Sequence, residues 1–188
     1  MISIGLDLSI NSTGICVYDS VTRQTEYYII GTKFTKKSLE YHHDNLNMIL
    51  CEKQIINAKD EYHTKESIKT SNIYNIVVII RTLIEKFKPD VATIEGVSFQ
   101  SNGSVLDLCG LNYMVRMMLQ ECNVPNMFIV SPTQNKKFAT GNGQAEKDVM
   151  ISAWHKLEPH MKDVPKYVKV DDISDAYFLA RYGVSLLS

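Results

Sequence analysis

The order of the hydrophobic patterns along the chain is the feature that most restricts its fold. Residues 2–32 contain three segments in which apolar residues alternate with small or polar ones, and turn-forming residues separate them. Such segments predict three consecutive antiparallel strands. Helical and strand patterns then alternate to the end of the chain. Strands first, followed by alternating helices and strands, predict an α/β fold with a mixed sheet.

Periodicity assigns the later elements. Apolar residues at spacings of three and four over 72–88 predict a helix packed on the sheet, and Pro89 ends it. The segment 33–71 is polar and mixed in charge, with a few clustered apolar residues, and we expect at least one helix within it. The other elements expected are strands at 91–94 and 127–130, helices at 104–121, 144–156 and 171–187, and a loop between 131 and 143.

The helix expected over 104–121 has apolar residues around most of its circumference, which indicates burial on more than one side. One side can face the sheet, and we expect the other to face a second copy of the chain. Leu111 and Met118 are candidates for the outward side. A homodimer formed through this helix is therefore expected.

The composition is typical of a folded domain. The chain has 188 residues, of which 45% are hydrophobic and 22% charged, and this length predicts a single domain over 1–188. No apolar run approaches the roughly 18 residues that cross a bilayer, and the first residues lack a basic and apolar leader. We therefore expect a cytoplasmic protein with no membrane partner. The formal net charge of −1 gives no global sign of nucleic-acid binding, which must then depend on local charge.

Four acids stand where a carboxylate is a poor structural choice. Asp7 interrupts the first strand, and Glu95 ends a buried strand. Asp172 and Asp175 open the last helix three residues apart, so they share a helical face. Each also has an ordinary alternative role. An acid at the start of a helix can cap it or interact favourably with its dipole, and an acid at a strand end can form a turn.

Together these acids indicate a metal site. Carboxylates brought together from two strand ends and a helix would raise each other's pKa unless a cation neutralised them. Oxygen ligands without a Cys or His cluster favour Mg²⁺ or Mn²⁺ over zinc. A site of this kind with two ions is suited to the in-line attack of water on a phosphodiester.

Four motifs carry a resemblance to a known family. They are IGLDLS at 4–9 with STG at 12–14, ATIEGV at 92–97, TGNGQAEK at 140–147 and DISDA at 172–176. In this order they resemble the motifs of RuvC-type Holliday junction resolvases, and the compact chain is similar to virus-encoded members. The first motif alone is shared with the RuvC-like domains of CRISPR effectors and with actin-like ATPases, whereas all four in order are specific.

The resemblance implies a ribonuclease-H-like fold, with a five-stranded mixed sheet whose first three strands are antiparallel and with helices on both faces. It implies a homodimer that makes paired symmetric nicks in a four-way DNA junction and leaves 5′-phosphate and 3′-hydroxyl ends. By position, the family's catalytic carboxylates, which bind two Mg²⁺ or Mn²⁺ ions, match Asp7, Glu95, Asp172 and Asp175. If the protein is virus-encoded, its compartment is the host cytoplasm.

Several further residues match by position. Lys147 matches the family's active-site lysine, and its place in the first turn of a helix, after a glycine-rich turn, suits a phosphate. It could also be an ordinary solvated lysine. Lys136 and Lys137 lie where the family uses basic residues on the DNA backbone. Phe99 lies near the family's aromatic wedge, but its spacing is one residue longer, and it could equally pack onto the domain.

The segment 33–71 departs from the family pattern. It is an insertion, expected to be helical, between the third strand and the first sheet-packing helix, and it is longer than the bacterial enzymes carry. Lys33, Lys36, Lys37 and Tyr41 could contact DNA arms, or the segment could form a solvated helical cap.

Three other functions remain open from the sequence. A nuclease of the same fold could act more broadly on branched DNA, forks or RNA–DNA hybrids. A protein with a dead site could bind junctions without cutting them. The opening motif would also suit an actin-like ATPase, although such proteins need a second, duplicated domain for which 188 residues leave no room.

Overall fold

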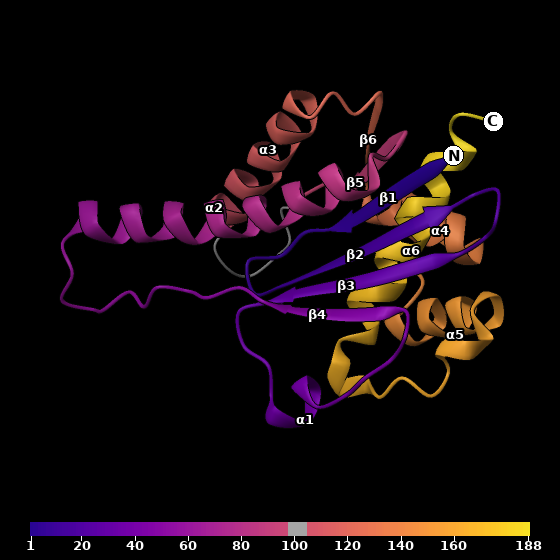
Figure 1. The fold of residues 1–188 in the computed structure, drawn as a ribbon, viewed down its shortest axis with the longest axis horizontal. Coiled ribbons are helices and arrows are strands. Elements are labelled where there is room, and N and C mark those ends of the chain that lie inside the picture. The colour runs from indigo at the N-terminus through magenta and orange to yellow at the C-terminus, as the bar shows by residue number, and fades with distance from the viewer. Residues whose placement is uncertain (98–104) are drawn as a thin grey trace.

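The computed structural model describes residues 1–97 and 105–188. A mixed sheet forms its centre, and helices lie on both faces (Figure 1). Its strands are β1 (Ile2–Asp7), β2 (Ser12–Asp19), β3 (Thr25–Gly31), β4 (Leu46–Leu50), β5 (Val91–Glu95) and β6 (Asn126–Val130). Its helices are α1 (Lys36–Leu39), α2 (Tyr62–Phe87), α3 (Val105–Glu121), α4 (Pro132–Thr140), α5 (Lys147–Leu157) and α6 (Val170–Ser185), with 3-10 turns η1 (Pro159–Met161) and η2 (Lys166–Val168). None of these helices is long and apolar enough to cross a bilayer.

The strand order in the sheet is β4-β3-β2-β1-β5-β6. β1, β2 and β3 form the predicted antiparallel meander, while β4, β5 and β6 each pair in parallel with a neighbour. The α/β architecture with a mixed sheet is confirmed, but over the described residues the sheet has six strands instead of five. Every strand except β2 runs in the same direction. Their carboxyl ends and the start of β2 therefore lie at one edge, here called the carboxyl edge of the sheet.

The sixth strand comes from the segment 33–71, which was expected to be a helical insertion. The segment does contain helix, as the turn α1 and the first residues of α2, but between them it forms β4, which pairs in parallel with β3. A short apolar cluster does not distinguish a buried strand from a helix by periodicity, and the open edge of β3 favours the strand. α2 begins at Tyr62, well before the helix expected over 72–88.

Strand alternation separates two hydrophobic cores, one on each face of the sheet. On β1, Ile4 and Leu6 are fully buried in the core formed with α2 and α3. Ser3 and Gly5 face α6 instead, and the Ser3 hydroxyl donates a 2.6 Å hydrogen bond to the carbonyl oxygen of Ala180. By the same alternation, the side chain of Asp7, the last residue of β1, lies on the α6 face.

Two glycines allow α6 to pack directly against the sheet. A Cβ atom on Gly5 would lie 2.0 Å from the carbonyl oxygen of Ala176. A Cβ atom on Gly14 would lie 2.3 Å from the carbonyl oxygen of Asp172. Such distances are too short for any other residue, so these glycines fix the first turns of α6 against β1 and β2.

The outward side of α3 differs from the expectation. Leu111 and Met118 are both buried in the core, so neither faces outward. Leu106, Tyr113 and Met117 are the exposed large apolar side chains of this helix. Their spacings of seven and four residues place them along one side of α3.

α4 occupies a region that was expected to be a loop. Ser131 caps it, because its side chain accepts a hydrogen bond from the backbone N–H of Gln134 and the Gln134 side chain accepts one from the backbone of Ser131. Pro132 is the first helical residue. This capping box, with a proline at the first position, is a local sequence pattern that predicts a helix start.

Candidate active site

Asp7 and Glu95 end neighbouring parallel strands. β1 pairs with β5 with Leu6 opposite Ile94, so the two acids that follow lie side by side at the carboxyl edge. By alternation both side chains lie on the α6 face, and both residues are partly buried. The carboxyl ends of parallel strands are where open α/β sheets commonly place their binding sites.

Asp172 and Asp175 reach the same place from α6. Asp172 lies in the first turn of the helix and accepts a 2.5 Å hydrogen bond from the hydroxyl of Ser12, at the start of β2. The close approach at Gly14 holds this turn against the sheet. Two strand ends and one helix thus bring together the four acids that the sequence singled out.

Burial and mutual repulsion raise the pKa values of these acids. The pKa of Asp7 lies well above its ordinary value because of burial and then the charge of Glu95, ahead of those of the two helix acids. Burial and the charge of Asp175 raise the pKa of Glu95 to about 7. Burial raises the pKa of Asp175 to about 6. The pKa of Asp172 is raised by burial, against the opposing effect of its hydrogen bond from Ser12.

Lys147 supplies a positive charge beside the cluster. It is the first residue of α5, and its Nζ donates a 2.6 Å hydrogen bond to Asp171. This bond raises the pKa of Lys147, and it offsets the effect of burial so that the pKa of Asp171 is lowered. The charge of Lys147 also lowers the pKa of Asp7 and Asp175. Because its side chain is 71% exposed, the ammonium is accessible from solvent.

α4 brings two further groups to the cluster. The charge of Lys136 lowers the pKa of both Glu95 and Asp175. The buried amide of Asn135 donates a 3.3 Å hydrogen bond to the backbone carbonyl of Asp175, and its polar side chain beside Glu95 opposes the rise in the pKa of that acid. Lys137 is exposed on the same helix.

Ser12, Asn135 and Asp171 are site neighbours whose roles the sequence did not reveal. Each is an ordinary polar residue whose contact with the cluster arises only when distant segments meet. For Asn135 the capping box of α4 was a usable indication of the helix, although not of the contact. Phe99, the candidate aromatic wedge, lies outside the described residues.

The donor chemistry of the cluster fits a hard divalent cation. Carboxylate oxygens are the ligands that Mg²⁺ and Mn²⁺ prefer, and nearby positive charge would offset the repulsion that raises these pKa values. Over residues 1–97 and 105–188, however, no group of three or more Asp, Glu, His or Cys side chains is positioned to hold a metal ion as it stands. The charge of the cluster therefore fits a metal, and a coordination shell requires rotation of its side chains.

Comparison with known proteins adds a family assignment. The family model described as crossover junction endodeoxyribonuclease RuvC matches residues 3–181. A crossover junction endodeoxyribonuclease RuvC of Prochlorococcus marinus is 32% identical over 60% of this chain and 73% of its own length. The enzyme of the same name from Petrotoga mobilis is 30% identical over 61% of this chain and 68% of its own length.

Solved structures show the same fold at low sequence identity. The Thermus thermophilus RuvC structure matches with a TM-score of 0.59 and 15% identity over 97% of each chain. T. thermophilus RuvC in complex with a Holliday junction substrate matches with a TM-score of 0.59 and 16% identity, over 100% of this chain and 96% of that one. The yeast mitochondrial Holliday junction resolvase Ydc2 matches with a TM-score of 0.50 and 16% identity, over 98% and 81% of the two chains. With a family match that spans nearly the whole sequence, the chain belongs to the RuvC family of crossover junction endodeoxyribonucleases.

Proposed function

We propose that this protein is a divalent-metal-dependent endonuclease that resolves four-way DNA junctions. The observation that supports this most directly is the meeting of Asp7, Glu95, Asp172 and Asp175 at the carboxyl edge, with pKa values raised by burial and mutual repulsion. Family membership supplies the substrate class, because the relatives are named crossover junction endodeoxyribonucleases and one was solved with a Holliday junction.

The four carboxylates would hold Mg²⁺ or Mn²⁺, two ions in each active site. When bound, such ions lower the pKa of a water molecule and stabilise the charge on the leaving oxygen of an in-line displacement. The chain's own contribution is to position the carboxylates: the hydrogen bond from Ser12 orients Asp172, and the polar side chain of Asn135 favours the charged form of Glu95. Cleavage of the P–O3′ bond by water leaves a 5′-phosphate and a 3′-hydroxyl.

The basic groups beside the cluster would bind the DNA backbone. Lys147 can exchange its hydrogen bond with Asp171 for one to a non-bridging oxygen of the scissile phosphate, because its side chain is largely exposed. Lys136 lies close enough to the cluster for its charge to lower the pKa of Glu95. Lys137, on the exposed side of α4, would contact a neighbouring phosphate, and Phe99 stays a candidate for the aromatic wedge.

Paired nicks require two active sites, and we assign the dimer contact to the outward side of α3. Leu106, Tyr113 and Met117 are 84%, 62% and 61% exposed, respectively. Such a row of large apolar side chains is typical of a surface that a partner covers. A second copy of the chain is the partner that symmetric cleavage requires.

The proposed function is tested by cleavage of an end-labelled four-way junction in Mg²⁺. Linear duplex, a three-way fork and an RNA–DNA hybrid serve as competing substrates. We expect symmetric nicks in the junction alone, and equal cutting of forks or hybrids would indicate a broader nuclease of the same fold. Asp7→Asn should abolish cleavage and leave junction binding intact, since it removes a metal ligand without altering the basic residues.

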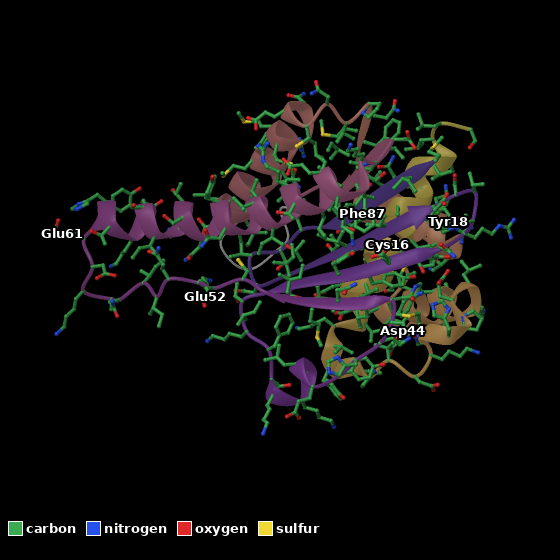
Figure 2. The ribbon with its side chains drawn as sticks, in the orientation of Figure 1. Cys16, Tyr18, Asp44, Glu52, Glu61 and Phe87 are labelled. Carbon is green, nitrogen blue, oxygen red and sulfur yellow. The ribbon has the colours of Figure 1, made fainter. Side chains whose placement is uncertain are left out.

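Asp44→Asn is a matched control for this substitution. Asp44 is exposed and precedes β4, at the end of the sheet opposite the carboxyl edge (Figure 2). It should cleave like the wild type. Full activity of Asp7→Asn would remove the proposed site, and absence of metal-dependent cleavage by the wild type would leave only a junction-binding protein.

A further inference from the structure

We infer that a groove next to the candidate active site binds an unpaired stretch of a DNA strand, through its phosphates and at least one base. The inference rests on the proposed function and adds a site to it. The groove has a volume of about 680 Å³. The lining residues that matter to the argument are Ser12, Lys33, Lys53, Ile55, Tyr167 and Lys169.

The groove lies along the carboxyl edge, and Ser12 links it to the acid cluster. Its lining includes Ser12, at the start of β2, and Gly31, at the end of β3. Ser12 is also the residue that donates a hydrogen bond to Asp172. A strand leaving the acid cluster along this edge therefore enters the groove directly.

Three lysines make the groove positive. Lys33, Lys53 and Lys169 are exposed and line it. Within the part of the chain that the structure describes, none of the three forms an ion pair with a carboxylate. In a chain of net charge −1, three such cations on one groove are suited to phosphate groups.

The wall on the side of η2 is built around Tyr167. The Nζ of Lys37 lies 4.7 Å from the centre of its ring, and Tyr41 meets the ring edge-on with a centroid distance of 6.4 Å. The hydroxyl of Ser38 donates a 3.4 Å hydrogen bond to the backbone carbonyl of Tyr167. These contacts hold the aromatic ring in place while leaving the residue 37% exposed.

The opposite wall, residues 51–56, is anchored just as firmly. The N–H of Cys51 donates to the carbonyl of Gly31 at 2.9 Å. Buried Asn72, on α2, bonds both backbone groups of Gln54, accepting from its N–H at 2.8 Å and donating to its carbonyl at 3.1 Å. Both walls are thus fixed before any ligand arrives, which lowers the entropy lost on binding.

The combination of groups favours an unpaired strand over a duplex. Tyr167 and the 80% exposed side chain of Ile55 are apolar surfaces between the cations. Grooves that bind single strands combine positive charge along the backbone with aromatic side chains on which bases stack. A paired duplex offers only its phosphates at such a surface, since its bases are already stacked, so it would use the lysines and not the aromatic ring.

The test measures binding of a fluorescent oligothymidylate of about 15 nucleotides by anisotropy in EDTA, so that no cleavage occurs. For Lys33→Ala/Lys53→Ala we expect the negative slope of log affinity against log salt to become shallower by about 1.4, which is about 0.7 for each lysine on a single strand. Tyr167→Ala should weaken binding of the oligothymidylate about fivefold or more. Tyr167→Phe should bind like the wild type. Binding of a duplex of equal length should not respond to either change at Tyr167.

The double variant Lys59→Ala/Lys65→Ala is the matched control, because it removes the same charge at the far end of α2. That end projects away from the sheet beside Glu61, whereas Glu52, the neighbour of the groove residue Lys53, lies close to the end of β4 (Figure 2). The control should leave the salt slope unchanged. Thermal denaturation of every variant identifies any that fail to fold. Because Lys33 and Lys53 are exposed, their substitution should leave folding intact, so the salt dependence of that variant tests the groove even if Tyr167→Ala unfolds.

Any one of three results would contradict the inference that the groove binds an unpaired strand. They are no binding of the oligothymidylate by the wild type, an unchanged salt dependence of binding in Lys33→Ala/Lys53→Ala, and an equal loss of single-strand and duplex affinity in Tyr167→Ala. The junction-cleavage assay separates this inference from the proposed function. If the groove binds the single strand but the protein does not cleave junctions, the proposed function is wrong and the groove inference is retained. If the protein cleaves junctions but binding does not depend on the groove, the groove inference is wrong and the proposed function is retained.

Discussion

At the scale of single residues, Glu95 retains its proton at pH values where an exposed carboxylate is ionised, because its pKa is about 7. The folded state therefore binds this proton more tightly than the unfolded state does. Stability from this group is present at low pH and decreases as the pH rises through about 7. The metal-free protein should accordingly be less stable at pH 8 than at pH 5 as far as this cluster is concerned.

Glu95→Gln should remove this dependence. In urea denaturation with EDTA we expect the variant to gain on the order of 1–3 kcal/mol of unfolding free energy over the wild type at pH 8, and little or nothing at pH 5. Glu52→Gln, a change of the same type at an exposed position, should gain nothing at either pH. An equal effect of Glu95→Gln at both pH values would contradict the assignment of its pKa.

The same protons compete with a metal ion, because a carboxylate must be deprotonated to bind one. With pKa values of about 7 for Glu95 and about 6 for Asp175, we expect cleavage at a fixed Mg²⁺ concentration to decrease as the pH falls from 8 to 5.5. More Mg²⁺ should move the midpoint to lower pH. If the pH midpoint of cleavage did not change with the Mg²⁺ concentration, a group other than these carboxylates would control the pH profile.

At the scale of elements, the site depends on how closely α6 approaches the sheet. Gly14→Ala would place a Cβ atom 2.3 Å from the carbonyl oxygen of Asp172, so the first turn of the helix must move away. We expect a loss of cleavage of at least tenfold, which corresponds to about 1.4 kcal/mol, together with a lower melting temperature. Cleavage rate and thermal denaturation measure the two effects.

Gly110→Ala, in the interior of α3, is the matched control. Its Cβ atom would lie 3.6 Å from the Cδ1 atom of Ile73, an ordinary contact. Because alanine favours a helix over glycine, we expect it to stabilise the protein by about 0.5–1 kcal/mol and to leave cleavage unchanged. If both glycine substitutions behaved alike, close packing of α6 would not be what positions Asp172.

At the scale of the whole molecule, paired cleavage should depend on the association of two chains. Met117→Glu places a charge on the outward side of α3 and should give monomers in sedimentation. On a cruciform plasmid these should produce nicked circles in place of linear product. Tyr62→Glu, at an even more exposed apolar residue at the start of α2, should keep the dimer. Linear product from a monomeric Met117→Glu variant would exclude this dimer as the cause of paired nicks.

The sequence by itself determined the features that depend on neighbouring residues. Alternation over 2–32 predicted the antiparallel meander, and the acids at strand ends and at the start of α6 were evident as polar residues in apolar surroundings. The motifs identified the family that the comparisons confirm. Even α4, which was expected to be a loop, had its local indication in the capping box at Ser131. Periods of two and 3.6 residues are properties of the local chain, and for that reason they can be read without a structure.

The tertiary structure alone decided what depends on segments far apart in the chain. The segment 33–71 supplies the edge strand β4 because β3 offers unpaired backbone groups, which no pattern within the segment records. The contact of Asn135 with Glu95, the bond between Lys147 and Asp171, and the groove between η2 and residues 51–56 arise in the same way. Burial of Met118 and exposure of Met117 likewise depend on which side of α3 meets α2. Each outcome is set by long-range packing, in which the free energy gained depends on a partner that the local sequence does not name.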